Sequence, residues 1–345
     1  MQPARPAIAR SLVALILAGS FFVGAASCFS TKSYAGTSEV KSIAGGEVIS
    51  LSCPTASFCL GVTQGSEYIV FNGRQWSAPK AITHLDVGEM SASCSSSQYC
   101  VAVAANDSYM FVFNGNTWSQ EGTSADFGSV TCTHDEFCMG DSSWIVRGRA
   151  MSYINGPLES YPPVDCVTPQ FCLDLVQVNQ KNYQTYIFNG HEWTGSRAYI
   201  PATTSTADVF SCGSVRHCIA ISSQIVRNTK TVAVTYELNG STWSALRTNN
   251  EVLTANESAG YSLSCVTANF CAALEDPGAS YDPHHGQLMT FNGSDWSDPL
   301  TIDPGYNFNA VSCATSRFCV AVDGNTSNVS AHAFEFNGKG WIPMQ

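Results

Sequence analysis

Seven pairs of cysteines with one fixed spacing constrain this 345-residue chain more than any other feature. Five residues separate the two cysteines of each pair. The pairs are Cys53 with Cys59, Cys94 with Cys100, Cys132 with Cys138, Cys166 with Cys172, Cys212 with Cys218, Cys265 with Cys271, and Cys313 with Cys319. Their first cysteines follow one another at intervals from 34 residues (Cys132 to Cys166) to 53 residues (Cys212 to Cys265), which is the range of propeller blades.

An Asn-Gly dipeptide, preceded by an aromatic or aliphatic residue, follows each cysteine pair. Asn-Gly between two β-rich runs is a strong signal for a hairpin with a type I′ turn. Six copies add tryptophan three residues after the glycine, and the third copy has Pro157-Leu158-Glu159 instead. Two strands around the cysteines and two around Asn-Gly make four strands per copy. We therefore predict an all-β fold, a seven-bladed β-propeller of four-stranded antiparallel blades, with a stacked solenoid as the rival fold.

The cysteine spacing also predicts the state of the thiols. The five-residue connection joins the first and second strands of a copy, so the two cysteines face each other across a hairpin and can form a disulfide. Each such bond stabilises the fold by roughly 2 kcal/mol in the chain-entropy treatment. Zinc is the weaker alternative, because zinc ligand pairs usually lie closer together and no fixed histidine accompanies the cysteines. We expect no metal and no cofactor.

The N-terminal segment has the pattern of an export signal. Arg5 and Arg10 precede an apolar run over 12–23, and small residues lead to Cys28. The run is too short for a comfortable membrane span. We expect 1–27 to be a signal peptide, 28–46 a flexible tether, and 47–345 the propeller.

Cys28 is the one cysteine outside a pair. Ala25-Ala26-Ser27-Cys28 resembles the lipobox of bacterial lipoproteins, which implies acylation of Cys28 and anchoring at the cell envelope. Ala25 stands where such signals usually have leucine, and a cut after Ala35 would instead release a soluble secreted protein.

The repeat units resemble those of secreted bacterial surface propellers, in which Val-Ser-Cys is followed by Phe-Cys-Val-Ala-Val and Phe-Asn-Gly-x-x-Trp. The resemblance covers 47–345. The units are also distantly similar to the Asp-box turn of sialidase-type propellers, although Phe, Ile or Leu stands where the Asp box has its aspartate. The resemblance implies the fold and carries over no catalytic residue.

Charge limits the classes of partner. Without residues 1–27, which hold two arginines and no acid, the chain has 14 basic and 27 acidic side chains, a net charge of -13. Bulk charge therefore disfavours nucleic acid and anionic membranes as partners. The expected partner is an unidentified protein or glycan at the cell envelope, with membrane contact only through the lipid, and the propeller is expected to be monomeric.

Loop lengths differ between the two edges of the predicted blades. The connections from the first to the second strand and from the third to the fourth emerge on one edge, the hairpin rim, and have constant length. The other connections emerge on the opposite edge, the loop rim, and vary in length. Loops free of packing constraints commonly carry recognition, so we expect the loop rim and the mouth of the central channel to be the working surface.

Two departures from the repeat supply candidate binding residues. The sixth copy carries an insertion over 275–286 that contains Tyr281, Asp282, His284 and His285, and its polar residues suit a ligand or, less readily, a metal ion. A plain solvated loop is the alternative.

In the third copy Trp144, Arg147 and Arg149 are expected in the connection between the second and third strands. Stacking on the indole and bidentate hydrogen bonds from the guanidinium groups would suit an acidic or sugar ligand. An amphipathic strand whose arginine stems cover apolar surface is the alternative.

Catalysis is not indicated by any recognisable motif. The chain contains no Gly-x-Ser-x-Gly elbow, phosphate-binding loop or dinucleotide fingerprint. A sialidase-like glycoside hydrolase would need an arginine cluster, a tyrosine nucleophile and paired acids, and the arginines of this chain lie in no recognisable motif. The sequence favours a non-catalytic binding or assembly module, with a hydrolase or a glycan-binding lectin as alternatives.

Overall fold

The computed structural model describes residues 42–344 apart from 86, 88, 105–107, 123–127, 158–163, 180–181, 202–206, 227–229, 247–259, 277–285, 302–306 and 325–330. Contacts divide the chain into 1–31 and 32–345, and all described residues belong to the second unit. Every regular element described is a β-strand. Among these residues there is no helix long and apolar enough to cross a bilayer.

The strands form seven antiparallel sheets in sequence order, as the repeat predicts. The first strands are β1 (Val48–Thr55), β5 (Met90–Ser96), β9 (Val130–Cys132), β13 (Asp165–Thr168), β17 (Ala207–Ser214), β21 (Gly260–Thr267) and β24 (Asn307–Thr315). The second strands are β2 (Phe58–Thr63), β6 (Tyr99–Ala104), β10 (Phe137–Gly140), β14 (Phe171–Asn179), β18 (His217–Val226), β22 (Phe270–Asp276) and β25 (Phe318–Gly324). The third strands are β3 (Glu67–Phe71), β7 (Tyr109–Phe113), β11 (Trp144–Arg147), β15 (Asn182–Phe188), β19 (Lys230–Asn239), β23 (Gln287–Phe291) and β26 (Ala333–Phe336). The fourth strands are β4 (Lys80–Ala81), β8 (Trp118–Gly122), β12 (Ala150–Tyr153), β16 (Trp193–Pro201), β20 (Thr242–Ala245) and β27 (Trp341–Pro343).

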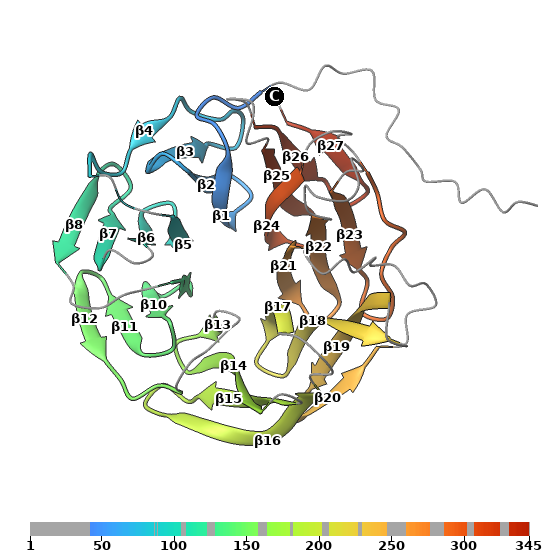
Figure 1. The fold of residues 1–345 in the computed structure, drawn as a ribbon. Coiled ribbons are helices and arrows are strands. Elements are labelled where there is room, and N and C mark those ends of the chain that lie inside the picture. The colour runs from blue at the N-terminus through green and yellow to red at the C-terminus, as the bar shows by residue number, and fades with distance from the viewer. Residues whose placement is uncertain are drawn as a thin grey trace, which may run out of the picture. The chain divides into compact units, whose positions relative to one another are not determined.

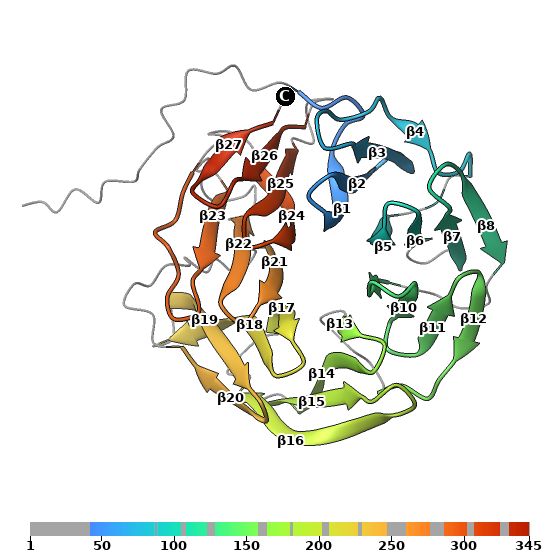
Figure 2. The same cartoon turned by 180° about the vertical axis from the view of Figure 1, so that it is seen from behind.

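The seven sheets are the blades of a propeller (Figure 1). The first strand of each blade lies next to the central channel and the fourth strand lies at the periphery, and the view from behind shows the same order (Figure 2). In the sixth blade the position of the fourth strand is held by two isolated bridges, Phe291 with Trp296 and Leu288 with Leu300. The predicted fold class is confirmed.

A disulfide joins the first two strands of every blade, also as predicted. The seven bonds are Cys53 to Cys59, Cys94 to Cys100, Cys132 to Cys138, Cys166 to Cys172, Cys212 to Cys218, Cys265 to Cys271, and Cys313 to Cys319. The paired cysteines have Cα atoms 3.9 to 4.1 Å apart.

The cysteine pairs also fix the direction of a backbone donor. Cys138 lies directly opposite Cys132 in register, and the same holds for Cys172 with Cys166 and for Cys271 with Cys265. So short a Cα separation belongs to the pairs of an antiparallel ladder that exchange no backbone hydrogen bonds. The N–H of the first cysteine therefore points away from the second strand.

The Asn-Gly turns connect the third and fourth strands in six blades, but their geometry differs from the predicted type I′ turn. The glycines have positive φ, for example 87° at Gly73, whereas no described asparagine of the motif does. The carboxamide oxygen of Asn72 instead accepts hydrogen bonds from the N–H groups of Arg74 (3.0 Å) and Gln75 (3.1 Å). The asparagine thus holds the turn as an Asx cap.

The third blade reaches four strands by a different route from the one predicted. Its second and third strands are joined by a tight turn at Asp141 and Ser142, both with positive φ, and its third and fourth strands by a turn at Gly148. Asn155-Gly156 follows the fourth strand. The assignment of this Asn-Gly to a hairpin between strands three and four was therefore wrong, because two shorter turns had already completed the blade.

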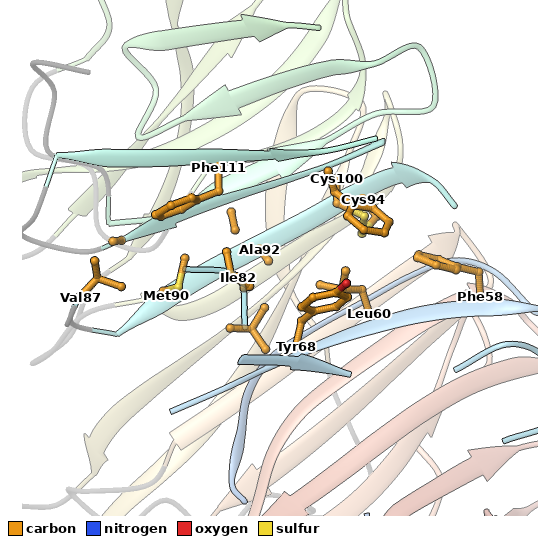
Figure 3. Close-up of a cluster of buried hydrophobic side chains, with 14 residues drawn as sticks. Phe58, Leu60, Tyr68, Ile82, Val87, Met90, Ala92, Cys94, Cys100 and Phe111 are labelled. Carbon is orange, nitrogen blue, oxygen red and sulfur yellow. A yellow bond between two sulfur atoms is a disulfide. The ribbon is translucent and has the colours of Figure 1, made fainter. Parts of the chain in front are cut away.

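The hydrophobic core lies between neighbouring blades. Figure 3 shows one such layer, in which Leu60 and Tyr68 of the first blade lie near Cys100 and Phe111 of the second. The repeated tryptophans pack in these layers, and several also hydrogen-bond to the preceding blade, as Trp243 Nε1 does to Thr185 Oγ1 at 2.8 Å. The tryptophans therefore contribute to packing between blades.

The N-terminal end of the described chain closes the ring. Ile43 is buried and forms an antiparallel bridge with Ala331 of the seventh blade, with its N–H 2.6 Å from the Ala331 carbonyl oxygen. Met344 donates to Ala333 further along the same strand edge. Ile43 therefore extends the outer edge of the last blade, although it precedes the expected propeller boundary at residue 47.

Candidate functional site

The inner strands are tied to one another by a repeated hydrogen bond. The N–H of the first cysteine in a blade needs an acceptor outside its own sheet, and the hydroxyl of the residue before the first cysteine of the preceding blade supplies it. The N–H of Cys53 donates to Ser312 Oγ at 2.9 Å. At 3.0 Å each, the same bond runs from Cys94 to Ser52, from Cys132 to Ser93, from Cys265 to Ser211 and from Cys313 to Ser264. The Ser-Cys dipeptide therefore links the blades around the channel.

Asp165 interrupts this ring of hydroxyls. It precedes Cys166 of the fourth blade, and its Oδ2 accepts the N–H of Cys212 at 2.7 Å where other blades use serine. Burial raises the pKa of Asp165, opposed by hydrogen bonds from the Cys212 backbone, the Ser211 side chain, the Cys166 backbone and the Thr131 side chain. The channel wall thus contains one carboxyl group whose charged form is disfavoured by burial.

A hollow of about 200 Å³ opens where the first three inner strands begin, at the loop rim. Its lining residues are Ile49, Ser50, Glu89, Met90, Ser91 and Gly128. Glu89 is exposed, while Ser50 accepts the N–H of Ala92 at 3.0 Å and fixes the neighbouring inner strands. The hollow is therefore lined by polar side chains and includes the Glu89 carboxylate.

A second polar group lies on the same rim between the first and last blades. The side-chain amide of Asn309 donates to Glu47 Oε1 at 3.1 Å and to the carbonyl oxygen of Val48 at 3.2 Å. Glu47 and Glu89 therefore place two carboxylates at the loop-rim ends of the first two inner strands.

The structure separates the three residues predicted in the third blade. Trp144 begins β11 at the loop rim, partly buried, with its ring 5.1 Å edge-on from Tyr153. Arg147 ends β11 at the hairpin rim, and Arg149 lies just beyond the turn. Both arginines therefore lie on the rim opposite to the predicted one, because the whole of β11 separates them from the loop between the second and third strands.

Both arginines also have structural partners. The Arg147 guanidinium lies 4.9 Å from the ring centre of Phe137, and Arg149 forms a 2.8 Å ion pair with Glu121 of the second blade. The hydroxyl of Tyr99 donates to the Gly148 carbonyl oxygen at 2.7 Å between them. Burial and the charge of Glu136 raise the pKa of Tyr99 to about 12, which keeps this donor protonated at neutral pH. These contacts favour docking of the hairpin onto the second blade over ligand binding.

The other predicted binding residues, Tyr281, Asp282, His284 and His285, lie outside the described residues, as does Cys28. Their roles stay predictions. Among the residues that the structure describes, no group of three or more His, Cys, Asp or Glu side chains is arranged to hold a metal ion.

Buried carboxylates on the second strands act between or within blades. Asp174 accepts a hydrogen bond from the Ser142 hydroxyl of the third blade. In the seventh blade Asp323 Oδ1 accepts the backbone N–H of His332 at 2.7 Å, and the two side chains approach to 3.5 Å. Both acids are fully buried, so neither carboxylate is exposed to a ligand at the surface.

Asp165, Glu47 and Glu89 were not among the candidate site residues predicted from the sequence. A signal for Asp165 was present, because Ser or Thr precedes the first cysteine in the six other copies. Nothing in the repeat marks Glu89, since its place at the channel mouth depends on how three blades come together.

Comparison with known proteins identifies the fold and no family. No family model matches the chain, and no curated protein matches it. Among solved structures it is similar to YCF48 bound to D1 peptide, at 14% identity and a TM-score of 0.54, covering 82% of this chain and 93% of the other.

Two carbohydrate-related propellers are also similar. The Aleuria aurantia lectin, a six-bladed β-propeller with a fucose recognition mode, matches at 11% identity and a TM-score of 0.52, covering 87% of this chain and 96% of the other. The GH74 xyloglucanase from Xanthomonas campestris matches at 11% identity and a TM-score of 0.61, covering 87% of this chain and 53% of the other. At such identities the likeness concerns the fold alone.

Proposed function

We propose that this protein is a non-catalytic binding module of the cell envelope, which engages a protein or glycan through its loop rim and the mouth of its central channel. The observation that carries the proposal is the hollow of about 200 Å³ lined by Ser50, Glu89 and Ser91. The Glu89 side chain in this hollow is exposed.

The distribution of the repeated residues supports this choice of surface. The cysteines and the serines before them form bonds within or between blades, and the tryptophans pack between blades. Arg147 and Arg149 on the hairpin rim are engaged by Phe137 and Glu121. The non-repeated polar residues at the channel mouth are left for recognition, and a rigid scaffold below variable loops is a common arrangement for binding.

The solved propellers to which this chain is similar support a protein or a glycan as the class of partner, and do not identify the partner. A structure of one neighbour contains a bound peptide, and another neighbour is a fucose-binding lectin. A hydrolase has less support, because the chain contains no recognisable catalytic motif. Glu47 and Glu89 favour a partner that presents basic or hydroxyl groups.

We also propose that the protein is exported and anchored to the membrane by a lipid. Seven disulfides persist only in an oxidising compartment, in agreement with the signal-like segment over 1–27. We propose that Cys28 carries the lipid and that 29–42 links it to Ile43.

The test is capture of partners from a cell-envelope extract on the immobilised protein, with proteins and glycans identified by mass spectrometry. Glu89→Arg reverses the charge at the channel mouth, and Glu192→Arg makes the same change at an exposed position on the hairpin rim. We expect a saturable partner that Glu89→Arg loses and Glu192→Arg retains. Equal loss in both variants, or a captured glycan that has been trimmed, would contradict the proposal.

A further inference from the structure

A groove of about 330 Å³ lies between the outer parts of the sixth and seventh blades. Its lining residues are Leu288, Thr290, Ser297, Asp298, Pro299, Leu300, Phe336, Lys339, Gly340 and Trp341. Leu288, Phe336 and Trp341 form a buried apolar floor, while Asp298 and Lys339 are exposed. The groove is separate from the channel mouth and contains none of the residues invoked there.

The interface between the first and second blades provides an internal reference for this groove. Trp76-Ser77-Ala78-Pro79 and Trp296-Ser297-Asp298-Pro299 follow the third strands of the first and sixth blades. In both, the serine hydroxyl accepts a backbone N–H from the third strand, from Val70 at 3.0 Å and from Thr290 at 3.1 Å. The backbones therefore match residue by residue.

Within this match, Leu288 corresponds to Tyr68. Tyr68 pairs with Lys80 across the outer strands, and Leu288 pairs with Leu300 in the same way. The Tyr68 ring fills the space between the first two blades, with its centre 5.7 Å from Trp118 and 5.8 Å from Phe113, edge-on to both (Figure 3 shows Tyr68 in this layer).

The seventh blade presents the same aromatic pair to the sixth. Trp341 and Phe336 occupy the positions of Trp118 and Phe113, with ring centres 5.5 Å apart. Leu288 has no ring to place against them. The groove is therefore the space that an aromatic side chain occupies in the first interface.

The mouth of the groove differs in charge and in width from the corresponding part of the interface between the first and second blades. Asp298 stands where the first blade has Ala78, and Lys339 stands where the second blade has Asn116. Gly340 replaces Thr117 and removes a side chain from the entrance. Opposite charges from two blades thus flank an apolar space of aromatic size.

We propose that this groove binds an aromatic side chain, tyrosine or phenylalanine, carried by a peptide segment of a protein partner. The ring enters beside Trp341 and Phe336 as the Tyr68 ring does beside Trp118 and Phe113. A basic residue of the peptide pairs with Asp298 and an acidic one with Lys339, which sets the direction of the segment.

The test measures binding of N-acetyl-L-tyrosinamide to the whole protein by calorimetry and by saturation-transfer NMR. Leu288→Tyr restores the side chain of the first blade and fills the groove, and Leu85→Tyr makes the same change at an exposed position outside it. We expect Leu288→Tyr to weaken binding by at least about tenfold and Leu85→Tyr to leave it unchanged.

A second variant keeps the test decisive if Leu288→Tyr does not fold. Gly340→Thr narrows the entrance as in the second blade, and a Cβ atom added at Gly340 has no neighbouring atom within 4 Å. It should also weaken binding of the probe. Undiminished binding in a folded variant of either kind overturns the proposal, and so does binding of methyl glycosides without binding of the tyrosine probe.

Discussion

Removing the hydroxyl of Ser264 should loosen the interface between the sixth and seventh blades. The hydroxyl accepts the N–H of Cys313 at 3.0 Å, and this N–H points away from its own sheet because Cys313 and Cys319 form a close pair. Ser264→Ala therefore leaves a backbone donor without its acceptor. The cost of an unsatisfied buried donor is about 1–3 kcal/mol.

Two matched variants separate this hydrogen bond from other effects of the substitution. Ser264→Thr keeps a hydroxyl at this position, where the third copy has Thr131, and Ser241→Ala removes a hydroxyl from an exposed turn. Equilibrium unfolding in urea with the disulfides intact should show a lower midpoint at unchanged slope for Ser264→Ala alone. Exchange of the Cys313 amide hydrogen should also become faster. Equal midpoints for Ser264→Ala and Ser264→Thr would refute the reasoning.

Three other predictions concern charge, covalent bonds and anchoring. Because burial raises the pKa of Asp165, the folded state binds the proton of this carboxyl group more tightly than the unfolded state does. The stability of the fold should therefore decrease as the pH rises from about 4 through the pKa of Asp165 in the folded state. Thermal unfolding at a series of pH values measures this decrease, and Asp165→Ser should abolish it. Mass spectrometry before and after reduction should count seven disulfides, and unreacted thiols at the paired positions would contradict the pairing. Cys28→Ala should shift the protein from the membrane fraction to the soluble fraction, and unchanged partitioning would rule out the lipid anchor.

The architecture could be predicted because its signals are local and repeated. The two cysteines of a hairpin, such as Cys53 and Cys59, lie six positions apart, so spacing alone specifies that the first and second strands pair. In the last copy Cys313 and Cys319 likewise face each other, in β24 and β25 (Phe318–Gly324). Seven copies of one unit then allow few arrangements other than a closed ring.

The third blade shows where a local signal fails. Asn155-Gly156 matches the motif, but turns at Asp141-Ser142 and Gly148 form the hairpins earlier in the chain. A dipeptide that favours turns, such as Asn-Gly, does not by itself determine which two strands the turn connects. The order of strands is decided by which segments complete a sheet.

The candidate sites depend on contacts between blades, which a single copy does not encode. Asp165 meets the N–H of Cys212, 47 residues later, and Leu288 is significant only because Trp341 belongs to the next blade. Aligning the copies shows Asp165 as an exception to the repeat, whereas the position of Leu288 varies and holds Tyr68, Met110 and Thr235 in other copies. Their chemical surroundings became visible only with the closed ring.

The bridge between Ile43 and Ala331 also determines how the molecule bears a load. If the chain is held through its N-terminal segment, a pulling force enters the propeller at Ile43 and reaches the hydrogen bond to Ala331 first. Beyond this residue, β1 is held by its neighbours on both sides, through Ser312 to Cys53 and through Ser52 to Cys94. The weakest point is thus a single residue at the periphery, and its detachment lengthens the link to the anchor while the blades stay joined.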